Sequence, residues 1–233
     1  MAYALAVLDS DTIAHPPVEA VFTVDEEIGL LGAAYIDTSD LKGRKLLNMD
    51  SEDEGVFTVS CAGGATVECI LSYHRAPTNA RIIEIKIDGF TGGHSGVEID
   101  KGRANANCIM GRILLNVFQN VGMRIVSVNG GEKDNAIAKI SEAAIAVLPE
   151  TAEKTKEIIE HTFAEVKEEY QSTDPNAKIQ INVMEEGLCE AISDMATLSV
   201  VVSLATMPNG IQRMNPDMPP VSYTHLTLPT NSR

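Results

Sequence analysis

Tryptophan is absent from this 233-residue sequence, and aromatic residues make up only 4% of it. Proteins that bind single-stranded nucleic acids use aromatic side chains as stacking platforms, so this scarcity argues against such a role. Positive charge is scarce as well: 18 Lys and Arg face 33 Asp and Glu, for a net charge of −15 at pH 7. Because that charge repels phosphate backbones and anionic membranes, we expect no nucleic-acid partner and no membrane partner.

Paired cysteines and long apolar runs are also lacking. The four cysteines, Cys61, Cys69, Cys108 and Cys189, form no C-x-x-C pair and have no His at zinc-finger spacing. Free thiols in a reducing compartment are the favoured interpretation. The apolar run at residues 1–8 is too short to span a bilayer, and the first Lys or Arg is Lys42. We therefore predict a cytoplasmic protein.

What the sequence does contain is two apolar runs that end in carboxylates. Residues 18–24 are typical of a strand and lead into Asp25-Glu26-Glu27, and residues 45–49 lead into Asp50. Carboxyl ends of neighbouring strands meet at one edge of an open α/β sheet, so these acids predict a single metal or acid/base site there. The competing interpretation is a solvated acidic turn, with Asp50 acting as a turn or helix cap.

A glycine-rich loop at residues 92–96, Gly-Gly-His-Ser-Gly, is the second candidate for function. Small neighbours leave the His94 imidazole exposed, and an imidazole can donate a hydrogen bond to a carboxylate or a developing oxyanion. A tight turn with an incidental histidine remains the alternative. Asn135 could orient a substrate group, although an asparagine in a turn is more often structural.

The expected elements from residue 80 onward follow the order β-α-β-β-α-β. Strands are predicted at 80–90, 123–128, 136–148 and 178–183, and helices at 105–120 and 150–170. This order is that of ferredoxin-like α+β domains. Residues 1–66 hold too few elements to enclose a parallel sheet alone, so they predict part of an α/β domain. Residues 67–219 would form the ferredoxin-like domain, and 220–233 a tail.

Five motifs in this order resemble the M20 metallopeptidases, and within them the aminoacyl-histidine (Xaa-His) dipeptidases. The resemblance covers residues 1–219, and the motifs are Phe22–Gly29, Leu47–Gly55, Cys61–Gly64, Gly92–Gly96 and Asn105–Asn107. It implies an α/β catalytic domain that holds two zinc ions and carries an inserted ferredoxin-like lid domain, through which a homodimer can form. Hydrolysis of small Xaa-His dipeptides by a zinc-activated water is the implied reaction.

The resemblance also implies roles for individual residues. Glu26 would be the general base, Glu27 a ligand of one zinc ion and Asp50 a ligand of the other. His94 would contact the substrate carboxylate or stabilise the tetrahedral oxyanion, and Asn135 would assist it.

Some parts of the family pattern have no counterpart here. The His-x-Asp motif, the bridging Asp and a later zinc-binding His are missing, so we expect a truncated form that is inactive alone. Residues 220–233 do not resemble the family and look like cloning-derived sequence. Two alternatives stay open: a non-catalytic ferredoxin-like module for dimerisation or ligand binding, and another M20 peptidase such as a tripeptidase.

Overall fold

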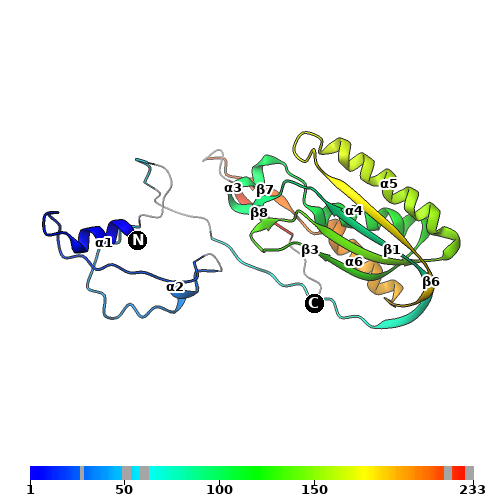
Figure 1. Cartoon of the computed structure of the whole chain (residues 1–233), viewed down its shortest axis with the longest axis horizontal. Coiled ribbons are helices and arrows are strands. Elements are labelled where there is room, and N and C mark those ends of the chain that lie inside the picture. Colours follow the sequence, from blue (N-terminus) through cyan, green and yellow to red (C-terminus); the bar gives the residue numbers. More distant parts are fainter. Residues whose placement is uncertain (27–28, 49–53, 58–62, 218–221, 229–233) are drawn as a thin grey trace. The chain divides into compact units, whose positions relative to one another are not determined.

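The computed structural model describes residues 1–26, 29–48, 54–57, 63–217 and 222–228 (Figure 1). Contacts within the chain divide it into two compact units, Met1–Gly64 and Ala65–Arg233. The division falls close to the boundary expected after residue 66. That the first unit is a catalytic piece and the second a lid stays a prediction.

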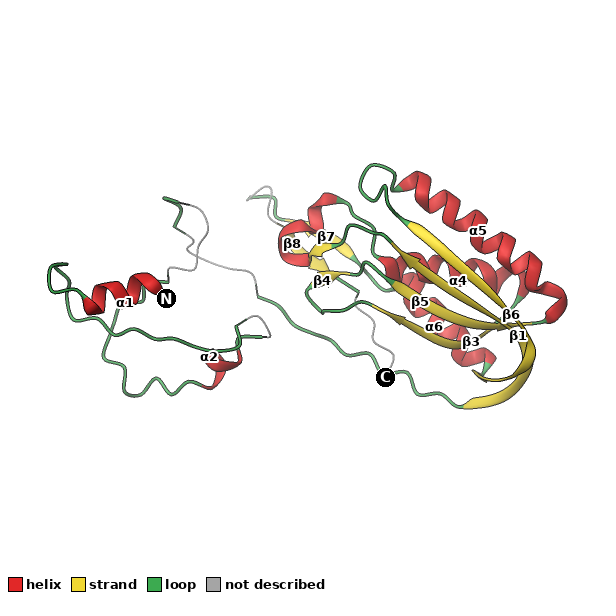
Figure 2. Cartoon of the chain, in the orientation of Figure 1, coloured by secondary structure: helices red, strands yellow, loops and turns green. Residues whose placement is uncertain are grey.

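The first unit holds two helices, α1 (Ala2–Asp9) and α2 (Leu31–Tyr35), joined by loops (Figure 2). Its described residues form no strand, so the strand expected at 18–24 is wrong, as is the described part, 45–48, of the strand expected at 45–49. A strand needs neighbours that bind its backbone N–H and C=O groups and cover its apolar face. The described part of this unit offers neither, and Val24 is 68% exposed.

The second unit is built on a four-stranded antiparallel sheet (Figure 1). Its strands are β1 (Arg75–Asp88), β3 (Arg124–Gly130), β5 (Ser141–Val147) and β6 (Lys178–Ile192). They lie in the order β3-β5-β1-β6, with helix α4 (Ala106–Val121) between β1 and β3 in sequence and α5 (Ala152–Glu169) between β5 and β6. The predicted ferredoxin-like β-α-β-β-α-β order is confirmed.

Shorter elements complete this unit. They are β2 (Gly93–His94), α3 (Ser95–Glu98), η1 (Ile99–Lys101), β4 (Ala136–Ile137), η2 (Pro149–Thr151), α6 (Asp194–Thr206), β7 (Gly210–Met214) and β8 (Ser222–Leu226). The strand expected at 136–148 is therefore interrupted: β4 leaves the main sheet and pairs with β2 instead.

One face of the sheet carries the core. Ile83, Ile85 and Ile87 alternate along β1 and are each at most 2% exposed, packed against α4 and α5. Burying one such side chain contributes about 1.5–3 kcal/mol. On the opposite face, Lys86 pairs with Glu142 at 2.5 Å. The period-2 alternation in the sequence thus separates a helix-covered face from a polar one.

Local sequence signals set the limits of helix α4. The Asn105 side chain accepts a hydrogen bond from the Asn107 N–H at 2.9 Å, which caps the first turn. Gly122, with a φ of 73°, ends the helix in a conformation that a side chain would disfavour. The cap also fixes the end of the loop that begins with the glycine-rich motif.

The last described residues join the second unit. Strands β7 and β8 pair antiparallel, and Leu228 is 8% exposed in the core. The Leu228 carbonyl accepts hydrogen bonds from the Asn105 and Asn107 side chains, both at 3.2 Å. Residues 222–228 of the expected tail therefore pack on the domain. Across the described residues, no helix is long and apolar enough to cross a bilayer.

Candidate functional site

The structure brings His94 and Asn135 together at one end of the second unit. Strand β2 pairs with β4, with His94 opposite Ala136 and Gly93 opposite Ile137. The N–H and the Oγ of Ser95 both donate to the Asn135 carbonyl, at 2.9 and 3.0 Å. Two segments that are 40 residues apart in sequence are therefore held side by side by backbone pairing.

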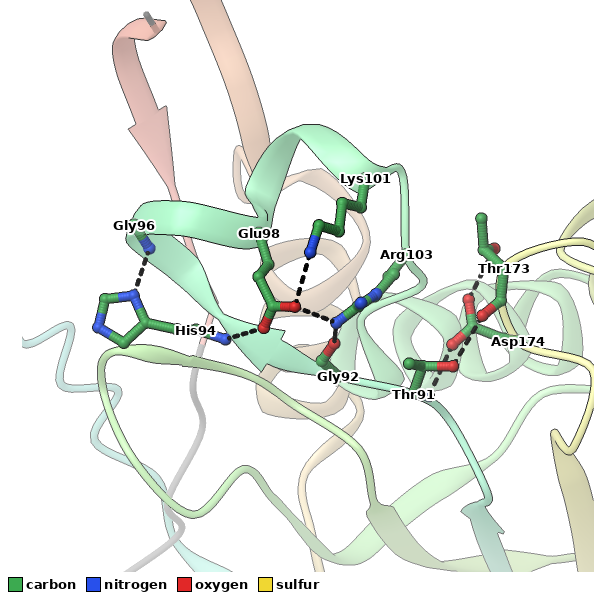
Figure 3. A network of polar contacts seen from close by, with 9 residues as sticks. All are labelled: Thr91, Gly92, His94, Gly96, Glu98, Lys101, Arg103, Thr173 and Asp174. Atoms are coloured by element: carbon green, nitrogen blue, oxygen red, sulfur yellow. Dashed lines mark hydrogen bonds and ion pairs between the residues drawn. The ribbon is translucent and has the colours of Figure 1, made fainter. Parts of the chain in front are cut away.

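The ring of His94 has a defined partner. Its Nδ1 accepts a hydrogen bond from the Gly96 N–H at 3.0 Å (Figure 3). Because that bond uses the Nδ1 lone pair, a neutral imidazole in this arrangement carries its proton on Nε2. The side chain is exposed, so the Nε2–H can donate to a bound molecule.

The Glu98 carboxylate binds both the backbone of this loop and two basic side chains. Its Oε2 accepts from the His94 backbone N–H at 3.0 Å, and its Oε1 contacts Lys101 Nζ at 2.9 Å and Arg103 at 3.1 Å. The Lys101 hydrogen bond, then the His94 N–H and the Arg103 charge, lower the pKa of Glu98 to about 2. The carboxylate therefore remains charged at physiological pH.

Arg103 extends the same arrangement, since its guanidinium also donates to the Gly92 carbonyl. Gly93 lies close to the Glu98 carboxylate and the Arg103 guanidinium and has a φ of 139°. A Cβ at this position would overlap both groups. A side chain here would be strained by the positive φ, and the Glu98 and Arg103 side chains would have to shift to make room for it.

Asp174, 1% exposed, anchors both ends of the segment from 91 to 104. Its Oδ1 accepts from the Thr91 N–H at 2.8 Å, and its Oδ2 accepts from the Ala104 N–H at 3.0 Å and the Thr173 hydroxyl at 2.8 Å. Neither Asp174 nor Glu98 belongs to a motif that the sequence reveals. Glu98 could have been noticed four residues after His94, whereas nothing local connects Asp174 to a loop about 80 residues earlier.

A turn begins at Glu26 in the first unit. The Glu26 carbonyl accepts from the N–H groups of Gly29 and Leu30, both at 3.1 Å, and its side chain is exposed. Asp25 adopts a φ of 59°, which is uncommon for a residue with a side chain. The predicted metal ligands Glu27 and Asp50 lie outside the described residues.

The described part of the chain does not assemble a zinc site. Among residues 1–26, 29–48, 54–57, 63–217 and 222–228, no group of three or more His, Cys, Asp or Glu side chains is placed to hold a metal ion. A closed zinc site needs four ligands and a catalytic one needs three. These residues alone therefore do not fit a zinc ion.

Comparison with known proteins shows the family of this chain. The M20 family's peptidase dimerisation domain matches residues 85–174. The cytosol non-specific dipeptidase of Escherichia coli (strain K12) is 32% identical over 216 residues, which cover 91% of this chain and 44% of the relative. The chain belongs to the M20 peptidase family. Another similar protein, the uncharacterized protein YqjE of Bacillus subtilis (strain 168), is 28% identical over 79% of this chain and 46% of its own length.

A solved structure supports the same conclusion. The crystal structure of aminoacylhistidine dipeptidase from Vibrio alginolyticus matches 98% of this M20 chain and 47% of that protein, with 27% identity and a TM-score of 0.68. The chain thus spans about half the length of the relatives it matches. The region that matches the dimerisation domain contains β2, β4 and the loop that carries His94.

Proposed function

We propose that the second unit of this M20 chain is the lid domain of a cytoplasmic dipeptidase and presents His94 to the substrate. The observation that carries the proposal is the His94 ring, whose Nδ1 is occupied by the Gly96 N–H while the exposed Nε2 side is free to face a ligand. A donor in that position suits a peptide's terminal carboxylate or the oxyanion of a tetrahedral intermediate. The Asn135 segment, fixed beside it by Ser95, would line the same place.

The proposed reaction is hydrolysis of a small dipeptide, with Xaa-His as the substrate class. The relatives' names support a dipeptidase but differ in breadth: one is called non-specific and the other an aminoacylhistidine dipeptidase. Glu26 remains the proposed base, and Glu27 and Asp50 the proposed ligands of two zinc ions. Zinc, when bound, lowers the pKa of a coordinated water to about 7.

We further propose that this chain alone has little activity, because Glu27 and Asp50 supply only two of the ligands that two zinc ions require. The test is an assay of the whole chain on β-alanyl-histidine and on a dipeptide without histidine, with added zinc, alongside metal stoichiometry. We expect hydrolysis near the uncatalysed background and fewer than two zinc ions per chain. Turnover at about 1 s⁻¹ or faster, the ordinary range for enzymes, would contradict this.

A non-catalytic dimerisation module is the second candidate. The observation that favours it is the second unit's own buried core, which includes Ile83, Ile113 and Ile145 at 0% exposure. Homodimer formation through this unit is compatible with both functions. The dependence of hydrolysis on His94 in a complete enzyme separates them: a stable dimer in which His94→Ala leaves hydrolysis unchanged would favour the module.

A further inference from the structure

We propose that Glu98 is a positioning residue for His94: together with Arg103 it holds the β2–α3 turn so that the imidazole presents its Nε2–H outward. This inference rests on the proposed function of His94 and adds a residue whose role is indirect. Glu98 does not face the exposed side of the ring. Its carboxylate contacts the His94 backbone N–H, Lys101 and Arg103, on the other side of the turn (Figure 3).

The orientation of the His94 ring depends on the shape of the turn. The ring of His94 is oriented by the Gly96 N–H, and that bond exists only while the backbone from 93 to 96 keeps its shape. Glycines at 92, 93 and 96 make this stretch intrinsically adaptable, since glycine loses more conformational freedom than other residues when it is ordered. The order must therefore come from contacts outside the stretch.

The Glu98 and Arg103 side chains supply such contacts. Glu98 Oε2 fixes the N–H of His94 at 3.0 Å, and Arg103 fixes the carbonyl of Gly92 while pairing with Glu98 at 3.1 Å. One ion pair thus binds a backbone donor and a backbone acceptor on either side of Gly93. The Glu98 and Arg103 side chains are only 25% and 18% exposed, so water screens the pair less than it would a surface pair.

The backbone next to Arg103 is itself anchored to the domain. The neighbouring Ala104 N–H is held by the buried Asp174, which also holds the Thr91 N–H. Both ends of the segment 91–104 are therefore attached to the domain. The ion pair between Glu98 and Arg103 joins residues within that segment. A carboxylate is suited to this role because it accepts several hydrogen bonds at once and donates none.

The experiment compares Glu98→Gln with Glu169→Gln in the full chain. Glu169 makes a similar ion pair, 2.6 Å from Arg112, between α4 and α5 and away from the turn. The readouts are the ¹⁵N shifts of the two His94 ring nitrogens and the hydrogen exchange of the Gly96 amide. We expect Glu98→Gln to bring the two ring shifts closer together and to speed exchange at Gly96 by about tenfold, the equivalent of one lost hydrogen bond to a charged group.

A second variant, Arg103→Met, removes the other half of the pair and is expected to change the same signals in the same direction. Urea unfolding of each variant shows whether the fold is kept. If the His94 ring shifts in Glu98→Gln and Arg103→Met match those in Glu169→Gln, the positioning role is overturned.

These readouts need no enzymatic activity, so they separate the two proposals. Altered ring signals in Glu98→Gln support the positioning role even where His94→Ala leaves hydrolysis by a complete enzyme unchanged, a result that would reject only the proposed function. Unaltered ring signals with hydrolysis that depends on His94 would reject only the role of Glu98.

Discussion

At the scale of single residues, the candidate site depends on carboxylates that bind backbone rather than substrate. His94 and Asn135 could be proposed from the sequence because a glycine-rich loop and a turn mark them. Glu98 and Asp174 could not, because their partners are backbone N–H groups whose positions only the folded chain defines. Local patterns therefore reveal the group that we propose to face the ligand and miss the groups that hold it.

Removal of Asp174 should be costly for stability. Asp174→Ala leaves the Thr91 and Ala104 N–H groups and the Thr173 hydroxyl without their acceptor, and each unsatisfied buried group costs about 1–3 kcal/mol. Because water can replace part of this, we expect a loss of about 2–4 kcal/mol in the free energy of unfolding, measured in urea. Asp100→Ala, at an exposed position on η1, is the control and should change it by less than about 0.5 kcal/mol.

Acid should protonate Glu98, and so weaken its contact with the His94 N–H, at a pH well below the usual range for glutamate. The folded pKa of Glu98 is about 2, against an ordinary value of 4.5, so its contribution is complete above about 4.5 and is lost as the pH falls towards 2. The backbone ¹⁵N shift of His94, followed during acidification, should titrate with a midpoint near 2, and Glu98→Gln should abolish that step. A midpoint at 4.5 would show that Lys101 and Arg103 do not hold the carboxylate.

At the scale of elements, helices and strands could be predicted where neighbouring elements cover their apolar faces. The ferredoxin-like order could be predicted because β1, α4 and α5 alternate apolar and polar residues with clear periods and pack on one another. The strand expected at 18–24 had an equally apolar pattern but has no neighbouring strand in the described part of its unit. Hydrophobic pattern predicts a strand only where the sheet that completes it is present.

The packing of α4 on α6 gives a test at this scale. A Cβ at Gly111 would lie 2.7 Å from the Leu204 backbone carbon, closer than real Cβ contacts allow. Gly111→Ala gains about 1 kcal/mol in helix propensity but forces the two helices apart, at a cost of about 1–3 kcal/mol. We expect net destabilisation by up to about 2 kcal/mol, seen as a lower urea midpoint.

Gly187→Ala in β6 is the matched control for Gly111→Ala, because a Cβ there meets nothing within 4 Å. Its urea midpoint should be unchanged or slightly raised, since alanine restricts the unfolded chain more than glycine does. Equal effects at the two positions would mean that the close approach of α4 and α6 does not limit stability.

At the scale of the whole molecule, the account predicts self-association. The family's dimerisation domain matches residues 85–174, and we expect the full chain to sediment as a homodimer at micromolar concentration. The net charge of −15 opposes association, so added salt should strengthen the dimer by screening that repulsion. Sedimentation analysis at low and moderate ionic strength measures the oligomeric state and its dependence on salt. A monomer under every condition would contradict the proposed homodimer.

The central claim is that this M20 domain presents His94 to a dipeptide. Its most direct test is a graft in which residues 85–174 replace the matching segment of the Escherichia coli dipeptidase, with and without His94→Ala. His161→Ala, at an exposed position on α5, is the control because it removes the same ring elsewhere in the graft. We predict that His94→Ala lowers kcat/KM by about 10²–10³, the usual effect of losing an oxyanion donor, while His161→Ala leaves it unchanged. Equal kcat/KM values for the two variants would contradict the claim.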